Sequence, residues 1–163
     1  MVEIKDIHQI FCKTGQTLGS VESFTGGLFA KEITAVAGAS KFYKGGLVAY
    51  ATETKQHLLE IENDLIQKYG VVSKQVAEAM AENGKRILNV SCCVSFTGNA
   101  GPDAMENKQV GEIYIGISYR NQTKVFSYQL EGDRNKIQQQ SITLALMQLQ
   151  KIMLQDNNCL DKK

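Results

Sequence analysis

The chain has 163 residues, of which 43% are hydrophobic and 21% charged, and its 18 basic and 17 acidic residues give a net charge of +1. This length suits one domain with a substantial core, and the composition is that of a globular protein. A nucleic-acid-binding surface normally shows a basic excess, so we expect no nucleic-acid partner. No stretch reaches the roughly 20 apolar residues that span a bilayer, and the first residues lack a signal-peptide core. We therefore expect a cytoplasmic protein without a membrane partner.

The four cysteines, Cys12, Cys92, Cys93 and Cys159, have no C-x-x-C spacing. Cys92 and Cys93 are adjacent in a predicted strand, so their side chains should point to opposite faces. We expect buried free thiols, with neither a metal site nor a disulfide framework.

The first half of the chain alternates predicted helices and strands. Ile4, Ile7 and Phe11 recur at helical spacing, and Gly15 is a plausible stop. The following predicted elements are a strand at 17–21, a helix at 26–36, a turn at 37–40, a strand at 46–51, a helix capped by Thr52, a short helix capped by Asn63 that runs through Tyr69, a helix at 74–88 capped by Ser73, and a strand at 91–96.

The second half predicts a hairpin and a long helix. Residues 112–120 and 124–130 alternate apolar and polar residues, with the turn at Asn121–Gln122. The last helix is expected over 135–154, before a polar tail at 155–163. Together the elements predict an α/β fold: a three-layer α/β/α sandwich with a mixed sheet, as a single domain over 1–154.

The segment Glu22–Gly27 is the first candidate for chemistry. It joins a predicted strand to a predicted helix, which places the Ser23 hydroxyl beside unpaired backbone N–H groups. Such N–H groups and the helix dipole favour a phosphate or a developing oxyanion, and glycines allow close approach of a ligand. The same residue types also suit an ordinary strand-to-helix turn.

Two further segments, 45–55 and 97–102, should lie near the first, because loops that leave strands converge at one end of an α/β sheet. A desolvated lysine beside a serine can act as a general base, so Lys55 could activate Ser23. The two histidines, His8 and His57, lie in predicted helices away from this motif, so a Ser-His-Asp triad is poorly supported. A solvated Lys55 remains the alternative.

Two residues near the last helix have competing interpretations. Asp133 is a plausible N-terminal cap, and Arg134 could contact a phosphate or carboxylate or lie in solvent. Tyr50 could orient a ring or simply pack.

Six motifs occur in a familiar order. They are Val-Glu-Ser-Phe-Thr-Gly-Gly (21–27), Gly-Gly-Leu-Val-Ala-Tyr (45–50) with Lys55, Gly-Val-Val-Ser-Lys-Gln-Val-Ala (70–77), Thr-Gly-Asn-Ala-Gly-Pro (97–102), Val-Gly (110–111) and Gly-Asp-Arg (132–134). Over about residues 5–152 the chain closely resembles the C-terminal domain of the CinA family, which also occurs as the stand-alone PncC-type nicotinamide-nucleotide amidohydrolase. Each motif is weak alone, but their order is specific.

The resemblance implies hydrolysis of the carboxamide of nicotinamide mononucleotide to nicotinate mononucleotide and ammonia, by a cofactor-free and metal-free homo-oligomer. It assigns Ser23 as the nucleophile, assisted by Tyr50 and Lys55. The expected substrate-binding residues are Glu22, Thr25, Gly26, Gly27, Gly46, Thr97, Gly98, Ala100, Gly101 and Arg134. The oxyanion would be bound by N–H groups near 25–27 or 98–101. The pyrophosphatase-like domain of longer CinA proteins is expected to be absent.

The chain departs from the family pattern around the expected site. Ala51 and Thr52 replace a usual Ser-Asn, Asn99 replaces an isoleucine, and Gln138 and Gln139 stand where many relatives carry arginine. These changes leave two alternatives open: a nucleotide- or phosphate-binding regulatory module with weakened catalysis, or an amidohydrolase for another small carboxamide.

Overall fold

The computed structural model describes residues 2–160, and the side chains of residues 2–156. Its centre is a five-stranded sheet in the order β2-β1-β3-β4-β5. The strands are β1 Leu18–Glu22, β2 Tyr43–Val48, β3 Cys92–Gly98, β4 Glu112–Tyr119 and β5 Gln122–Gln129. β1 runs parallel to β2 and β3, whereas β4 is antiparallel to β3 and to β5. The predicted mixed sheet is confirmed.

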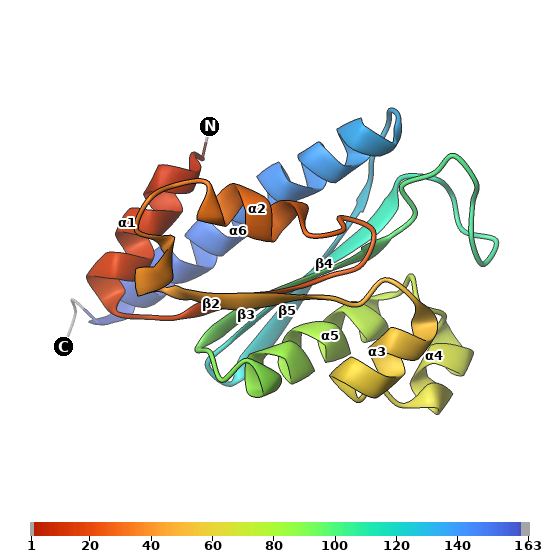
Figure 1. Cartoon of the computed structure of the whole chain (residues 1–163), viewed down its shortest axis with the longest axis horizontal. Helices are drawn as coiled ribbons and strands as arrows, with labels where there is room; N and C mark the ends of the chain where they lie inside the picture. The colour runs from red at the N-terminus through yellow and green to blue at the C-terminus, as the bar shows by residue number, and fades with distance from the viewer. Residues whose placement is uncertain (1, 161–163) are drawn as a thin grey trace.

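Helices cover both faces of this sheet (Figure 1). The helical elements are α1 Ile4–Thr14, α2 Leu28–Thr34, the 3₁₀ turn η1 Ala39–Lys41, α3 Thr52–Leu59, α4 Asn63–Tyr69, α5 Lys74–Ile87 and α6 Arg134–Leu160. In Figure 1, α1, α2 and α6 lie on one face, and α3, α4 and α5 lie on the other. This arrangement confirms the single three-layer α/β/α domain. None of the helices in the described residues combines the length and apolar content needed to cross a bilayer.

Two hydrophobic cores fill the spaces between the sheet and its helices. Cys92 belongs to the core under α1 and α6, and Cys93 belongs to the core under α5, so the predicted opposite orientation is confirmed. Burial raises the pKa of the Cys92 thiol to about 12, and burial also raises the pKa of Cys93 well above its ordinary value. Cys12 is exposed, contrary to the expectation of buried thiols, because it lies on the outer side of α1. The Cys159 side chain lies outside the described residues.

Most helix signals in the sequence are confirmed. Gly15 ends α1 with φ 67°, a left-handed conformation that glycine adopts without strain. The Ser73 hydroxyl caps α5 by accepting a hydrogen bond from the Val76 N–H at 3.2 Å. Thr52 does not cap α3, however, because Ala51 holds the extended cap position. Asn63 likewise is the first residue of α4 and not its cap, since Glu62 holds that position.

Strand β2 lies earlier in the sequence than predicted, at Tyr43–Val48 instead of 46–51. Its partner β1 ends at Glu22, which is paired with Val48, so the chain beyond Val48 has no strand beside it. Tyr50 therefore lies in a connection that enters α3 and not in a strand. The hairpin turn is also shifted by one residue, since Tyr119 pairs with Gln122 around a two-residue turn.

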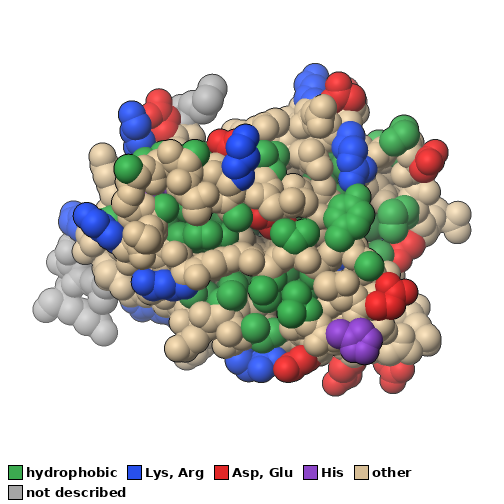
Figure 2. Space-filling model, viewed as in Figure 1, with side chains coloured by type: hydrophobic (Ala, Val, Ile, Leu, Met, Phe, Trp, Pro, Cys, Tyr) green, Lys and Arg blue, Asp and Glu red, His purple; other side chains and the backbone are tan. Residues whose placement is uncertain are grey.

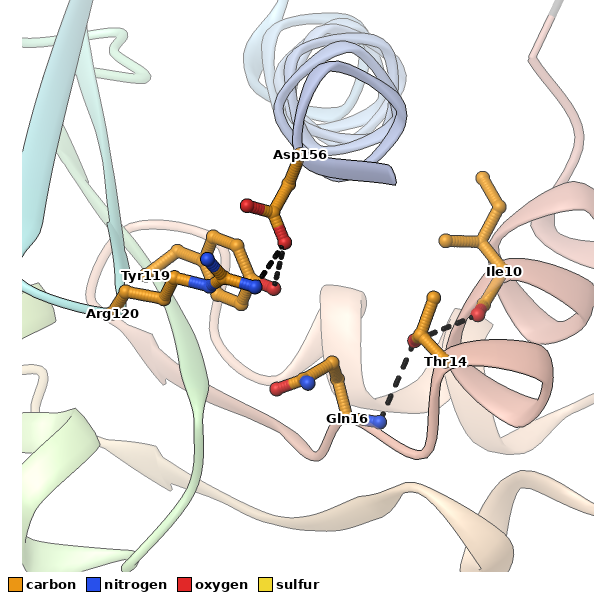
Figure 3. Close-up of polar contacts among 6 residues, drawn as sticks. All are labelled: Ile10, Thr14, Gln16, Tyr119, Arg120 and Asp156. Atoms are coloured by element: carbon orange, nitrogen blue, oxygen red, sulfur yellow. Dashed lines mark hydrogen bonds and ion pairs between the residues drawn. The ribbon is translucent and has the colours of Figure 1, made fainter. Parts of the chain in front are cut away.

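Helix α6 continues past the predicted end at Leu154 as far as Leu160. Asp156 explains part of this extension: its carboxylate accepts a 2.8 Å hydrogen bond from the Tyr119 hydroxyl and lies 2.6 Å from Arg120 (Figure 3). The predicted polar tail thus begins inside a helix, and its residues 161–163 lie outside the described part. Figure 3 also shows Thr14 at the end of α1, where its hydroxyl donates to the Ile10 carbonyl.

The charged side chains on the face in Figure 2 are scattered among apolar and polar ones. Basic and acidic side chains both occur there, as the near-neutral composition predicts.

Candidate active site

The turn between β1 and α2 holds Ser23 in a fixed position. The Ser23 N–H donates to the Phe96 carbonyl at 3.0 Å, and the Ser23 carbonyl accepts from the Gly26 N–H at 3.0 Å. Gly26 and Gly27 have φ values of 61° and 102°, which a residue with a side chain rarely adopts. The turn thereby ties the nucleophile candidate to β3.

Glu22 lies next to Ser23 but turns its carboxylate toward the start of α2. It is 1% exposed and accepts hydrogen bonds from the N–H groups of Gly27, Phe29 and Ala30 at 3.1, 3.1 and 2.9 Å. Of the N–H groups that the sequence offered to a phosphate or oxyanion, those of Gly26 and Gly27 are therefore bonded within the protein. In the structure Glu22 and Gly27, which were expected to bind substrate, bond to each other and hold the start of α2.

Lys55 enters from α3 and meets Ser23. Its side chain is buried, and its Nζ donates to Ser23 Oγ at 2.9 Å and to the carbonyls of Ala49 and Tyr50 at 2.8 and 3.1 Å. Burial lowers the pKa of Lys55 to about 8, whereas the negative charge of Glu106 acts in the opposite direction. The structure thus brings the two residues together, and burial makes the Lys55 ammonium easier to deprotonate than an exposed one.

A cavity of about 130 Å³ opens beside this pair. Of the residues expected at the site, it is lined by Ser23, Tyr50, Lys55, Thr97, Gly98, Ala100, Gly101 and Arg134. Five others do not line it: Glu22, Thr25, Gly26, Gly27 and Gly46. Among the described residues, no group of three or more metal-ligating side chains is placed to hold a metal ion.

Gly46 lies in the middle of β2, paired with Ser20. A Cβ atom at Gly46 would lie 2.5 Å from the Tyr43 hydroxyl and 2.7 Å from Ser20 Oγ, two atoms that are hydrogen-bonded to each other at 2.7 Å. The glycine therefore makes room for this pair and does not reach the cavity. Thr25 is likewise buried beside the turn, and its hydroxyl has no hydrogen-bond partner in the described part of the chain.

Tyr50 and Arg134 meet at the rim of the cavity. Tyr50 is 59% exposed, and its hydroxyl accepts a 2.7 Å hydrogen bond from Arg134 Nη2, while Arg134 Nη1 donates to the Gly101 carbonyl at 2.8 Å. Tyr50 bonds to Lys55 through its backbone carbonyl and not through its hydroxyl. Asp133 caps α6 as expected, since it accepts from the Lys136 N–H at 2.9 Å, and this cap places Arg134 at the first turn.

The far wall of the cavity comes from the end of β3. The Thr97 hydroxyl donates to the Val71 carbonyl at 2.7 Å, so its role in the structure is to tie β3 to the segment before α5. A Cβ at Gly98 would lie 2.6 Å from Ile113 and 2.9 Å from the Glu112 carbonyl, which requires glycine there. The backbone N–H groups of Ala100 and Gly101 have no acceptor within the described residues.

Sequence reasoning missed the other side of the cavity. Val71, Val72, Asp103 and Met105 also line it, and Glu106 lies close behind. Pro102 is the one proline of the sequence, but the acidic residues that follow it have no period that would single them out. Gln138 was noted only as a departure from the family pattern.

The structure gives Gln138 a specific contact. Its Nε2 donates to the Phe24 carbonyl at 2.7 Å, so α6 is hydrogen-bonded to the turn that carries Ser23.

Comparison with known proteins decides the family. The model of the CinA C-terminal domain matches residues 3–153. The chain belongs to this family. A competence-damage inducible protein of Bacillus cytotoxicus is 40% identical over 144 residues, and one from Bacillus cereus is 39% identical. Each alignment covers 88% of this chain and 35% of the relative, so the chain spans about a third of the length of these curated relatives.

Solved structures of the CinA superfamily share the fold. A competence/damage-inducible protein from Agrobacterium tumefaciens superimposes with a TM-score of 0.86 at 28% identity, covering 90% of each chain. A competence or damage-inducible protein from Enterobacter asburiae gives 0.90 at 22% identity, over 92% of this chain and 95% of that one. The architecture of this CinA domain is therefore confirmed by structure as well as by sequence.

Proposed function

We propose that this CinA domain is a serine amidohydrolase that converts nicotinamide mononucleotide to nicotinate mononucleotide and ammonia. The observation that carries the proposal is the 2.9 Å contact between Lys55 Nζ and Ser23 Oγ at the wall of a cavity. The mononucleotide as substrate comes from the family resemblance, and the geometry supports the class of reaction.

Lys55 is suited to take the serine proton. Its depressed pKa of about 8 leaves roughly a tenth of the protein with a neutral amine near pH 7. The carbonyls of Ala49 and Tyr50 accept two N–H groups of that amine and so direct its lone pair toward Ser23. A lysine held in this way replaces the histidine of a Ser-His-Asp triad.

The reaction would proceed in two stages. Ser23 Oγ attacks the carboxamide carbon while Lys55 accepts the hydroxyl proton, and the N–H groups of Ala100 and Gly101 donate to the oxyanion. Lys55 then passes the proton to the leaving nitrogen, so that the C–N bond breaks, ammonia departs and an ester to Ser23 remains. Water, deprotonated by Lys55, attacks the ester and releases the carboxylate and the serine hydroxyl.

The size of the cavity suggests how the substrate would lie. About 130 Å³ is below the roughly 300–1,000 Å³ of sites that enclose a whole drug-sized ligand. The cavity would therefore hold the carboxamide and its ring, with the ribose and phosphate at the rim beside Arg134. In this pose the Tyr50 hydroxyl holds Arg134, so Tyr50 would assist the reaction by positioning Arg134 and not by transferring a proton.

Ammonia release from nicotinamide mononucleotide, measured for the wild type and Ser23→Ala, tests the proposal. We expect release by the wild type and a loss of about 10³-fold or more in the variant, since a serine nucleophile has no substitute. Equal rates, or no release by either protein, would defeat it. Thermal stabilisation by the mononucleotide without ammonia would instead support the binding-module alternative, and release only from other carboxamides would point to another substrate.

A further inference from the structure

The loop at 102–110 is fastened to the opposite side of the cavity. In Figure 1 it belongs to the long connection between β3 and β4 that projects past the end of the sheet. The Glu106 carboxylate accepts from the N–H groups of Val71 and Val72 at 2.9 and 3.2 Å. Since both valines line the cavity, this contact makes the loop part of the cavity wall.

Asn99 holds the same loop from inside. Its Nδ2 donates to the carbonyls of Met105 and Lys108 at 3.2 and 3.3 Å, and its backbone carbonyl accepts from the Gly111 N–H at 2.7 Å. The loop is thus fixed at its base and along its length, which gives its side chains defined positions relative to Ser23.

Of the two acidic residues in this loop, Glu106 holds the loop in place and Asp103 does not. Asp103 lines the cavity and is the one acidic side chain among the described residues that do so. It is exposed, and within the described part of the chain its carboxylate makes no hydrogen bond or ion pair. Arg134, on the rim formed with Tyr50, supplies a positive charge to the same cavity without being paired to Asp103.

We infer that Asp103 is a specificity-determining residue that selects carboxamides carried on a cationic ring. A ligand that matches the cavity places a positive charge beside Asp103 and a negative charge beside Arg134, as an N-substituted pyridinium nucleotide does. The inference rests on the proposed function for the location of the carboxamide at Ser23. A charge pair near contact distance at a solvent-exposed rim corresponds to roughly a fivefold preference in affinity.

The test measures binding and not turnover. Dissociation constants are determined by calorimetry on Ser23→Ala protein for nicotinamide mononucleotide and for its reduced dihydropyridine form. The two probes share the carboxamide, ribose and phosphate, but the reduced ring is uncharged. We expect a roughly fivefold preference for the oxidised form, which Asp103→Asn abolishes and Asp103→Glu largely keeps. Glu82→Gln removes an exposed acidic charge on α5, outside the cavity lining, and should leave the preference unchanged.

Equal affinity for both forms, or an unchanged preference in Asp103→Asn, would overturn the inference, as would binding of neither form. An equal loss in Glu82→Gln would overturn it too, because net charge would then account for the effect. If the Asp103-dependent preference is found but the wild type releases no ammonia, the inference stands and the proposed hydrolysis fails.

Discussion

The buried centre of the site and its exposed rim are built on different principles. At the centre, Lys55 is 2% exposed and Glu22 is 1% exposed, and both have their polar atoms bonded to backbone groups or to Ser23. At the rim, Tyr50 is 59% exposed and Asp103 has no partner in the described structure. Leaving a buried polar group unpaired costs free energy, so hydrogen bonds within the fold fix the centre, whereas rim residues are free to change with the ligand.

The departures from the family pattern lie around the Ser23–Lys55 pair and replace neither residue. Thr52 lines the cavity, Asn99 anchors the 102–110 loop, and Gln138 donates to the Phe24 carbonyl. Asn99 and Gln138 make hydrogen bonds of their own, and Ser23 and Lys55 remain bonded to each other. The domain thus keeps the proposed nucleophile and base, while the residues around them differ from the family pattern.

The largest expected effect is the loss of ammonia release when Lys55, at the buried centre, is replaced and the rim residues are left unchanged. Lys55→Met fills a similar volume but has no amine, so we expect ammonia release to fall by about 10³-fold, within the range for loss of a general base.

Tyr50→Phe removes only the hydroxyl that binds Arg134 and should raise KM by about threefold with kcat nearly unchanged. Steady-state kinetics of both variants check this.

Circular dichroism of both variants controls for folding. If Tyr50→Phe lowered kcat as much as Lys55→Met does, the tyrosine would belong to the catalytic centre and the division between centre and rim would be wrong.

Glu22 offers an intermediate effect, on stability. Glu22→Gln keeps the size but replaces one carboxylate oxygen by an NH₂ group, which cannot accept from the N–H groups at the start of α2. We expect the free energy of unfolding to drop by about 2 kcal/mol. Urea denaturation measures it, with the exposed Glu53→Gln as a matched control. An unchanged midpoint for Glu22→Gln would show that the carboxylate does not hold α2.

The sequence predicted the elements well because hydrophobic period and caps are local signals. The helical spacing before Gly15 and the cap at Ser73 each correspond to a contact within a few residues. The pairing of Ser23 with Lys55 was also within reach, since both follow strands whose ends meet at one edge of the sheet.

The remaining errors concern contacts that only the folded chain creates. Nothing local shows that Glu22 bonds to N–H groups five to eight residues ahead, or that Gly46 is needed to fit the Tyr43–Ser20 pair. The direction of Tyr50 depends on where β1 stops, and the place of Glu106 depends on a loop without periodicity. In each case the contact depends on how an irregular segment packs against another part of the fold, which local sequence patterns do not show.

The smallest expected effect comes from the negative charge of Glu106, which acts on the pKa of Lys55. In the proposed mechanism neutral Lys55 is the base, so kcat/KM should rise about tenfold per pH unit at low pH and level off above about pH 8. Glu106 raises the pKa of Lys55, so Glu106→Gln should lower it and shift the profile toward lower pH. Glu106 is exposed and screened by salt, so we expect only about a twofold gain in rate near pH 6.5.

Glu53→Gln on α3, whose charge has no resolved influence on Lys55, is the control and should leave the pH profile in place. Raising the ionic strength should shrink the gain in Glu106→Gln, since screening already weakens the wild-type interaction. A profile that moved to higher pH would mean that Glu106 acts by holding the loop against Val71 and Val72, and that its charge does not reach the base.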